Sequence, residues 1–233
     1  MKKKILIGTA TYNEVDNIKI FLNSVLKLNI DLDILIIDDF SPDGTYKIIT
    51  DFQKENKQIF LINRKFKRGL DSAHKLIYDY AIKNNYDFLI TMDADMSHSP
   101  SDIQKFLNEI QNYDCVIGSR YIDGGENQLK GFRYFLSKYG NLFIKNFLKL
   151  NLSEYTTSFR CFNLKKLNNF NFNLVNATGY SFFMQCICIL IKLNYSIKEI
   201  PIIFYERNEG SSKIPKLELL RTLFYVILLK FKM

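Results

Sequence analysis

Short hydrophobic runs alternate with amphipathic segments along the first half of the chain. The runs lie at residues 4–10, 34–37, 59–62, 86–92 and 115–118. After the first run, Ile18, Phe21, Leu22 and Val25 recur at helical spacing, which predicts a helix over about 14–28. Strands that alternate with helices are typical of right-handed βαβ crossovers in a parallel sheet. The pattern therefore predicts an α/β fold.

The second half has a different pattern. It predicts a helix at 132–150 with a basic face, a strand at 156–162, an apolar helix at 180–193 and a strand at 197–205. We expect a main domain at 1–213 and a separate amphipathic helix at 214–233. That helix has the character of one that lies on a membrane surface, and docking on its own domain is the alternative.

Length and composition limit the class of protein. The chain of 233 residues, 47% of them hydrophobic, fits one α/β domain. Its uncharged apolar runs are too short for a membrane-spanning helix or a signal-peptide core, so we expect a cytosolic chain. Neither a Gly-x-Gly-x-x-Gly motif nor a Walker loop follows the first strand, which disfavours dinucleotide oxidoreductases and P-loop NTPases.

The net charge and the cysteine pattern limit the classes of partner, metal site and disulfide that the chain is expected to have. A formal charge of +8 favours an anionic partner such as a nucleotide, a phosphate or an acidic membrane surface. Nucleic acid is disfavoured because no stacking-aromatic motif or helix-turn-helix pattern is present. The four cysteines form no Cys-x-x-Cys pair and the two histidines are far apart, which favours buried reduced thiols over zinc or disulfides.

Carboxylates follow three of the predicted strands. Glu14 follows the first strand, Asp38 and Asp39 the second, and Asp93 and Asp95 the fourth. Parallel sheets bind ligands outside the carboxyl ends of their strands. Carboxylates gathered there favour Mg²⁺ or Mn²⁺, held by one or two of them and completed by substrate phosphates. Asp38 or Asp39 can instead bind a ribose or base, cap a helix or orient a loop.

Basic residues form a second group. Arg120 follows the fifth strand, Arg133 and Ser137 share a helix face, and Arg207 and Lys213 lie near the end. Arginine suits phosphate oxygens because its guanidinium donates in a planar fork. Beside a nucleotide site, this group predicts a second substrate that carries a phosphate.

Seven segments follow one another in the order of a known family. They are Ala10 to Glu14, Asp38 to Thr45, Gly69-Leu70, Met92 to His98, Gly118 to Tyr121, Ser158 to Arg160, and Gly210 to Lys213. From about Ile5 to Lys213 the chain closely resembles family-2 glycosyltransferases of the dolichyl-phosphate mannosyltransferase type. Seven ordered motifs are specific where any one alone is weak.

The resemblance implies a GT-A fold, a Rossmann-like and mostly parallel sheet flanked by helices. It implies inverting transfer of a hexose, mannose first, from a GDP- or UDP-sugar to a polyprenyl phosphate. It also implies Mg²⁺ or Mn²⁺ and a peripheral position on the cytoplasmic face of a membrane, where a small membrane partner subunit is possible.

The resemblance also assigns roles to residues. Those expected to line the nucleotide are Ala10, Tyr12, Glu14, Ile37 and Asp39. Those expected to meet the diphosphate are Asp93, Ala94 and Asp95, with Asp93 and Asp95 as metal ligands. Those expected to bind phosphates of donor and acceptor are Arg120, Arg133, Ser137, Arg207 and Lys213. Asp93, Asp95 and Arg120 are the expected catalytic residues.

The chain departs from the family's pattern at several positions, of which Glu154 and Thr157 lie near the expected sugar pocket. Glu154 and Thr157 replace Asp and Gly, and Gln185 stands where Glu is usual. Because Gln185 cannot take a proton, a phosphate acceptor is favoured, with Asp123 a possible base if the acceptor is a hydroxyl. The rivals are a family-2 enzyme with a glycan hydroxyl acceptor and a nucleotide-sugar-binding subunit without turnover.

Overall fold

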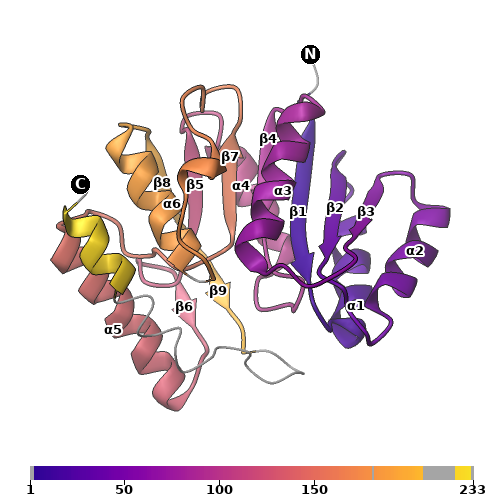
Figure 1. Ribbon diagram of the computed structural model, residues 1–233, viewed down its shortest axis with the longest axis horizontal. Coiled ribbons are helices and arrows are strands. Elements are labelled where there is room, and N and C mark those ends of the chain that lie inside the picture. Colours follow the sequence, from indigo (N-terminus) through magenta and orange to yellow (C-terminus); the bar gives the residue numbers. More distant parts are fainter. Residues whose placement is uncertain (1–2, 180, 207–223, 232–233) are drawn as a thin grey trace.

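A seven-stranded sheet forms the centre of the molecule in the computed structural model, which describes residues 3–179, 181–206 and 224–231. The strands lie in the order β3-β2-β1-β4-β7-β5-β8 (Figure 1). Their bounds are β1 (Ile5–Thr11), β2 (Asp33–Asp38), β3 (Ile59–Asn63), β4 (Phe88–Thr91), β5 (Cys115–Ser119), β7 (Arg160–Asn163) and β8 (Ile197–Pro201). All pairs are parallel except those of β7, which is antiparallel to β4 and β5.

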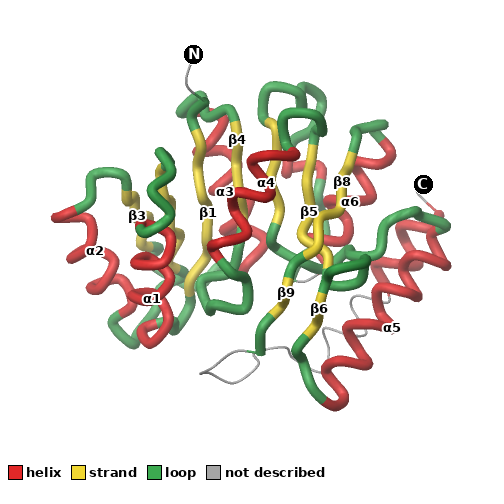
Figure 2. Tube along the Cα trace, turned by 180° about the vertical axis from the view of Figure 1, so that it is seen from behind, coloured by secondary structure: helices red, strands yellow, loops and turns green. Residues whose placement is uncertain are grey.

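Helices cover both faces of the sheet. The face seen in Figure 1 carries α3 (Leu70–Lys83) and α6 (Ser181–Lys192), with α5 (Gly131–Leu148) beyond β8. The face seen in Figure 2 carries α1 (Val15–Leu26), α2 (Thr45–Glu55) and α4 (Ile103–Glu109). The chain also forms two 3₁₀ turns, η1 (Pro100–Asp102) and η2 (Phe172–Leu174). The predicted mostly parallel sheet flanked by helices is confirmed.

The two hydrophobic cores follow from strand geometry. Successive side chains of a strand point to opposite faces, so Leu35 and Ile37 lie in one core while Ile34 and Ile36 lie in the other. On β1, Gly8 lets α3 approach closely, because a Cβ at this position would collide with Ile77. Both faces of the strands are buried, which explains their continuous apolar runs.

The long helices agree with prediction, and two predicted strands do not. The strand expected at 156–162 is β7, which begins only at Arg160 and runs antiparallel. The single strand expected at 197–205 is wrong, because it divides into β8 and β9 (Ile203–Phe204). At the break, the Ile202 N–H bonds the Ser119 carbonyl while its own carbonyl bonds Glu126 N. The chain thus leaves the sheet and β9 pairs with β6 (Glu126–Asn127).

The C-terminal segment is described only over 224–231, which is helical. Val226 and Leu229 are buried in the same core as α5 and α6, and the Lys230 ammonium donates to the Phe147 carbonyl at 2.7 Å. This part of the expected helix therefore docks on the domain. No helix within the described residues has the length and apolar character needed to cross a bilayer.

All four cysteines are buried free thiols, as predicted. Burial raises the pKa of each, to about 11 for Cys186. They are therefore protonated at neutral pH and behave as small apolar side chains.

His74 on α3 makes the fold sensitive to acid. Its ring is buried and packs edge to face against Phe183 with 4.9 Å between the ring centres, and burial together with the charge of Arg160 lowers its pKa to about 3. The unfolded chain takes up this proton near pH 6.5 and the folded chain does not, so stability falls as pH drops below 6.5. We expect this residue to cost about 2 kcal/mol of unfolding free energy between pH 7 and pH 5.

The check is urea denaturation of wild type and His74→Phe at both pH values. Phenylalanine keeps the ring and cannot titrate, so the variant should lose this share of the pH dependence. Equal losses in the two proteins would contradict the assignment to His74.

Candidate active site

Asp38, at the end of β2, is a structural carboxylate. It is fully buried and accepts hydrogen bonds from Thr11 Oγ1 (2.8 Å), Ser41 N (2.9 Å) and Ser41 Oγ (2.7 Å). These bonds join the ends of β1 and β2 and fix the turn that leads to α2. Of the roles left open by the sequence, loop orientation describes Asp38.

Asp39 faces the other way and holds the basic loop between β3 and α3. Its carboxylate accepts from Arg64 Nη1 (2.9 Å), Arg68 N (2.8 Å) and Gly69 N (2.8 Å). Burial alone would raise the pKa of Asp39, but the Arg64 guanidinium and the two backbone N–H groups lower it below its ordinary value. Its predicted contact with a nucleotide stays a prediction.

The other residues predicted to line the nucleotide surround the end of β1. The Lys67 ammonium lies 3.4 Å from the centre of the Tyr12 ring, so the basic loop reaches over this side chain. Glu14 accepts from Asn17 Nδ2 at 2.9 Å, and its N–H donates to Thr45 Oγ1 at 3.0 Å. Ala10 is half-buried. Ile37 lies wholly in the core, which leaves its backbone as the part that can meet a ligand.

Asp93 and Asp95 follow β4 on a tight loop. Asp93 accepts from Ser158 Oγ at 2.7 Å, and about a third of its side chain is exposed. Asp95 is nearly buried and accepts from Ser97 N (3.0 Å) and Ser97 Oγ (2.6 Å). Ala94 between them is buried in the core.

The pair fits a hard divalent cation that a substrate helps to coordinate. Carboxylate oxygens are the ligands that Mg²⁺ and Mn²⁺ prefer. Within the described residues, no group of three or more His, Cys, Asp or Glu side chains is placed to hold a metal. Asp93 and Asp95 are two carboxylates, so phosphate oxygens and water would have to complete the coordination.

Arg120, after β5, is a buried cation directed by its neighbours. Its Nε donates to Glu154 Oε2 at 2.7 Å, its Nη2 donates to Thr156 Oγ1 at 3.2 Å, and its guanidinium lies 4.4 Å from the centre of the Phe204 ring. Burial would lower its pKa, but the charges of Glu154 and Asp93 help to raise it above the ordinary value. Arg120 is therefore charged at every working pH.

Helix α5 brings the second group of predicted residues to the same end of the sheet. Ser137 Oγ accepts from the hydroxyl of Tyr121, the neighbour of Arg120, at 2.6 Å. Arg133 forms an ion pair with Glu206 at 3.7 Å, and about two fifths of each side chain is exposed. Arg207 and Lys213 lie outside the described residues.

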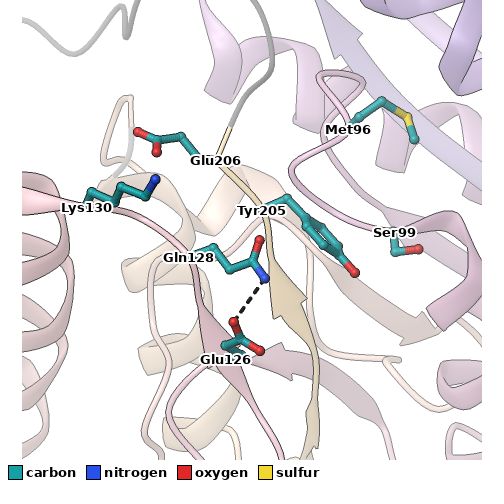
Figure 3. Close-up of a pocket in the computed structure, with 7 residues that line it drawn as sticks. All are labelled: Met96, Ser99, Glu126, Gln128, Lys130, Tyr205 and Glu206. Carbon is teal, nitrogen blue, oxygen red and sulfur yellow. Dashed lines mark hydrogen bonds between the residues drawn. The ribbon is translucent and has the colours of Figure 1, made fainter.

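A cavity of about 680 Å³ opens between the loop after β4 and the β6–β9 pair (Figure 3). Its lining residues are Met96, Ser99, Glu126, Gln128, Lys130, Tyr205 and Glu206. Sequence reasoning missed the carboxylates Glu126 and Glu206, although Glu206 directly precedes the predicted Arg207. The available signal was their position beside the Gly124-Gly125 loop and Arg207.

Two residues that depart from the family's pattern have structural partners. Gln185 Oε1 accepts from Ala177 N at 2.6 Å, which ties α6 to the loop before it. Glu154 binds Arg120 and is itself fully buried. Asp123 is exposed on the loop before β6.

Comparison with known proteins adds independent findings. Residues 6–170 match the model of the family "Glycosyl transferase family 2". The chain is 31% identical over 212 residues to an undecaprenyl-phosphate mannosyltransferase of Micrococcus luteus, covering 91% of this chain and 87% of that one. It is 29% identical over 227 residues to a polyprenol monophosphomannose synthase of Mycolicibacterium smegmatis, covering 96% of this chain and 86% of that one.

Solved structures show the same fold at low identity. A glucosyl-3-phosphoglycerate synthase of Mycobacterium tuberculosis, in complex with Mn²⁺, UDP-glucose and glycerol 3-phosphate, has a TM-score of 0.68 and 14% identity over 99% of this chain and 79% of that one. A mannosyltransferase of Pyrobaculum calidifontis, in complex with GDP-mannose and Mn²⁺, has a TM-score of 0.61 and 14% identity over 100% of this chain and 64% of that one. These likenesses confirm the expected GT-A fold, and the family match over most of the chain shows that this protein is a member of glycosyl transferase family 2.

Proposed function

We propose that this protein transfers a hexose, with mannose as the first candidate, from a nucleotide-sugar to a polyprenyl phosphate and inverts the anomeric carbon. One observation carries the proposal: Asp93, which follows β4 together with Asp95, lies near enough to Arg120 for its charge to raise the pKa of Arg120, and Tyr121 beside Arg120 bonds Ser137 on the helix that also carries Arg133. Such a site can bind two phosphate groups at once. Of the two relatives named above, one is named an undecaprenyl-phosphate mannosyltransferase and the other a polyprenol monophosphomannose synthase, which supports this choice of substrates.

In this proposal, different residues bind the diphosphate of the donor and the phosphate of the acceptor. Asp93 and Asp95 would hold Mg²⁺ or Mn²⁺, which neutralises charge on the departing nucleotide diphosphate. Arg120 would donate to phosphate oxygens on which negative charge increases as the sugar leaves. Both solved neighbours named above contain Mn²⁺ with a nucleotide-sugar, which supports a divalent metal.

A phosphate acceptor needs orientation more than it needs a base. Its second pKa is about 6 for a monoester, so it is mostly ionised at neutral pH. Gln185 is engaged with Ala177 N and cannot accept a proton as a base would. Arg133 and Ser137 would hold the acceptor, so that an oxygen already carrying charge attacks the sugar.

A glycan hydroxyl acceptor is the second candidate because two carboxylates line the cavity. Glu126 or Glu206 would then act as the general base that a hydroxyl requires. Binding of a nucleotide-sugar without turnover is the remaining alternative. Transfer assays separate all three.

An exposed aromatic stripe on α5 supports a membrane surface as partner. The stripe is defined by Phe132, Phe135, Tyr139, Leu142 and Phe143, which are all exposed. Their spacing places them on one helix face, with Lys138 and Lys145 beside it. Apolar residues flanked by lysines are typical of helices that lie in a membrane interface. A small membrane partner subunit is the alternative occupant.

The first test is metal-dependent donor binding. Titration of GDP into the protein should show affinity that requires Mn²⁺ in wild type. Asp95→Ala should weaken binding by about 10-fold or more, because one of the two predicted metal ligands is lost. Asp31→Ala, an Asp-x-Asp carboxylate at the opposite edge of the sheet, is the matched control and should bind as wild type does. Metal-independent binding would contradict the site.

The second test is sugar transfer. Purified protein, Mn²⁺, a panel of GDP- and UDP-sugars and polyprenyl phosphate should give glycolipid, with GDP-mannose the expected donor. Arg133→Ala should lower transfer to the lipid about 100-fold and change slow donor hydrolysis less than about threefold, because Arg133 is assigned to the acceptor.

Each outcome of the transfer assay decides between the alternatives. Equal losses of transfer and hydrolysis in Arg133→Ala would remove that residue from the acceptor site. Transfer to a glycan and not to the lipid would favour the hydroxyl acceptor and a base at Glu126 or Glu206. Donor binding without any transfer would favour the non-catalytic subunit.

The third test is binding to vesicles. Wild type should sediment with vesicles that contain about a third phosphatidylglycerol, and the double variant Phe132→Ser/Phe135→Ser should lose about 10-fold in partition because apolar area is removed from the interface. Ile20→Ser, at an apolar position on α1 that is about as exposed as Phe135, should sediment as wild type does. Equal partition of the double variant and wild type would contradict the stripe as the contact.

A further inference from the structure

Residues 154–158 reach both charged groups of the site. They form the irregular segment just before β7, and because β7 runs antiparallel, this segment lies at the edge where the parallel strands β4 and β5 end. Asp93 follows β4 and Arg120 follows β5. The segment therefore spans the gap between the predicted metal ligand and the predicted phosphate-binding cation.

The first half of the segment fixes Arg120. Glu154 Oε2 accepts from Arg120 Nε at 2.7 Å, while Glu154 Oε1 accepts from Thr156 Oγ1 at 2.8 Å. Thr156 Oγ1 also accepts from Arg120 Nη2 at 3.2 Å. Two of the three guanidinium nitrogens are thus held, and within the described chain Nη1 has no acceptor. Nη1 is the nitrogen left to bind an oxygen of a substrate.

The second half of the segment fixes Asp93. Ser158 Oγ donates to Asp93 Oδ1 at 2.7 Å, and the Ser158 carbonyl accepts from Thr91 Oγ1 on β4 at 2.6 Å. Asp93 lies near enough to Arg120 that its charge raises the pKa of Arg120. Five consecutive residues therefore contact both the Asp93 carboxylate and the Arg120 guanidinium.

The segment is itself anchored on three sides. The N–H of Glu154 donates to Glu199 on β8 at 3.0 Å, and the N–H of Tyr155 donates to Asn141 on α5 at 2.8 Å. The buried Arg160 guanidinium donates to the carbonyls of Tyr155 and Thr157, both at 2.9 Å. Bonds to β8, α5 and β7 leave it little freedom to move.

We propose that residues 154–158 act as a clamp that sets the separation of Arg120 and Asp93, and that Glu154 is the positioning residue which directs Arg120 Nη1 toward a phosphate oxygen of the substrate. The inference rests on the proposed function and deepens it by assigning a role to Glu154. The Glu154 side chain is fully buried and its carboxylate accepts from Arg120 Nε. An aspartate there keeps the charge and is one methylene shorter, so it would draw the guanidinium away from the substrate.

Four variants test the clamp. Glu154→Asp keeps the charge and changes the reach, whereas Glu154→Gln keeps the reach and removes the charge. Thr156→Val removes the hydroxyl that bridges Glu154 and Arg120, and Thr156→Ser keeps it as the matched control. Glu154→Gln leaves Arg120 buried without a partner and so can impair folding, which is why the Asp and Thr156 variants carry the test.

Two measurements distinguish the clamp from a merely structural role. In the transfer assay, Glu154→Asp and Thr156→Val should lower kcat about tenfold or more, with the KM for donor changed less than about threefold. Their thermal midpoints should stay within about 3 °C of wild type, and Thr156→Ser should behave as wild type does. Equal activity of the Val and Ser variants, or losses that track the thermal midpoint, would overturn the proposal.

Binding of pyrophosphate with Mn²⁺ provides a readout that does not depend on the acceptor. Pyrophosphate resembles the leaving group, which gains negative charge only as the sugar departs, so its affinity should fall about fivefold or more in Glu154→Asp and Thr156→Val even though the donor KM changes little. It should stay unchanged in Thr156→Ser. Equal affinities in all variants, or no binding by wild type, would overturn the clamp. Pyrophosphate binding that follows the expected order without transfer to polyprenyl phosphate would instead overturn the proposed function and leave the clamp standing.

Discussion

The reversed direction of β7 is the constraint on which the site depends. In a sheet whose strands all run in parallel, only strand ends and the loops after them reach the carboxyl edge. Because β7 runs the other way, the residues before it reach that edge as well and lie between the ends of β4 and β5. Glu154 and Ser158 thereby meet Arg120 and Asp93, which follow different strands.

Electrostatics explains how several acids can share this edge of the sheet. Asp38 accepts three hydrogen bonds and Asp39 is paired with Arg64, so the fold itself stabilises both negative charges. Glu154 is stabilised in the same way by Arg120 and Thr156, which hold its pKa below the ordinary value although burial favours the opposite. Asp93 is the acid of this group with the largest share exposed. The structural acids thus organise the edge at which the side chain of Asp93 is partly exposed.

Sequence reasoning predicted the parts that depend on local pattern. The run at Ile34 to Ile37 and the apolar helix at 180–193 correspond to β2 and α6, since both follow from period and length. Strand direction has no such signal, so the antiparallel β7 was missed. Asp38 and Asp39 are adjacent and alike in sequence, yet they face different loops. The pair of Arg120 with Glu154 joins residues 34 positions apart, and periodicity carries no information about such a contact.

Helix α5 contacts the candidate active site on one side and carries an exposed apolar surface on the other. Its buried Asn141 bonds Tyr155 N and so supports the clamp, while Ser137, one turn earlier, bonds Tyr121. Its outer face carries the aromatic stripe, and the helix over 224–231 packs beside its end through Lys230 and Phe147. An acceptor with a charged head and an apolar tail requires a polar site next to an apolar surface. A single helix that presents both faces meets this requirement, because helix periodicity fixes the angle between them.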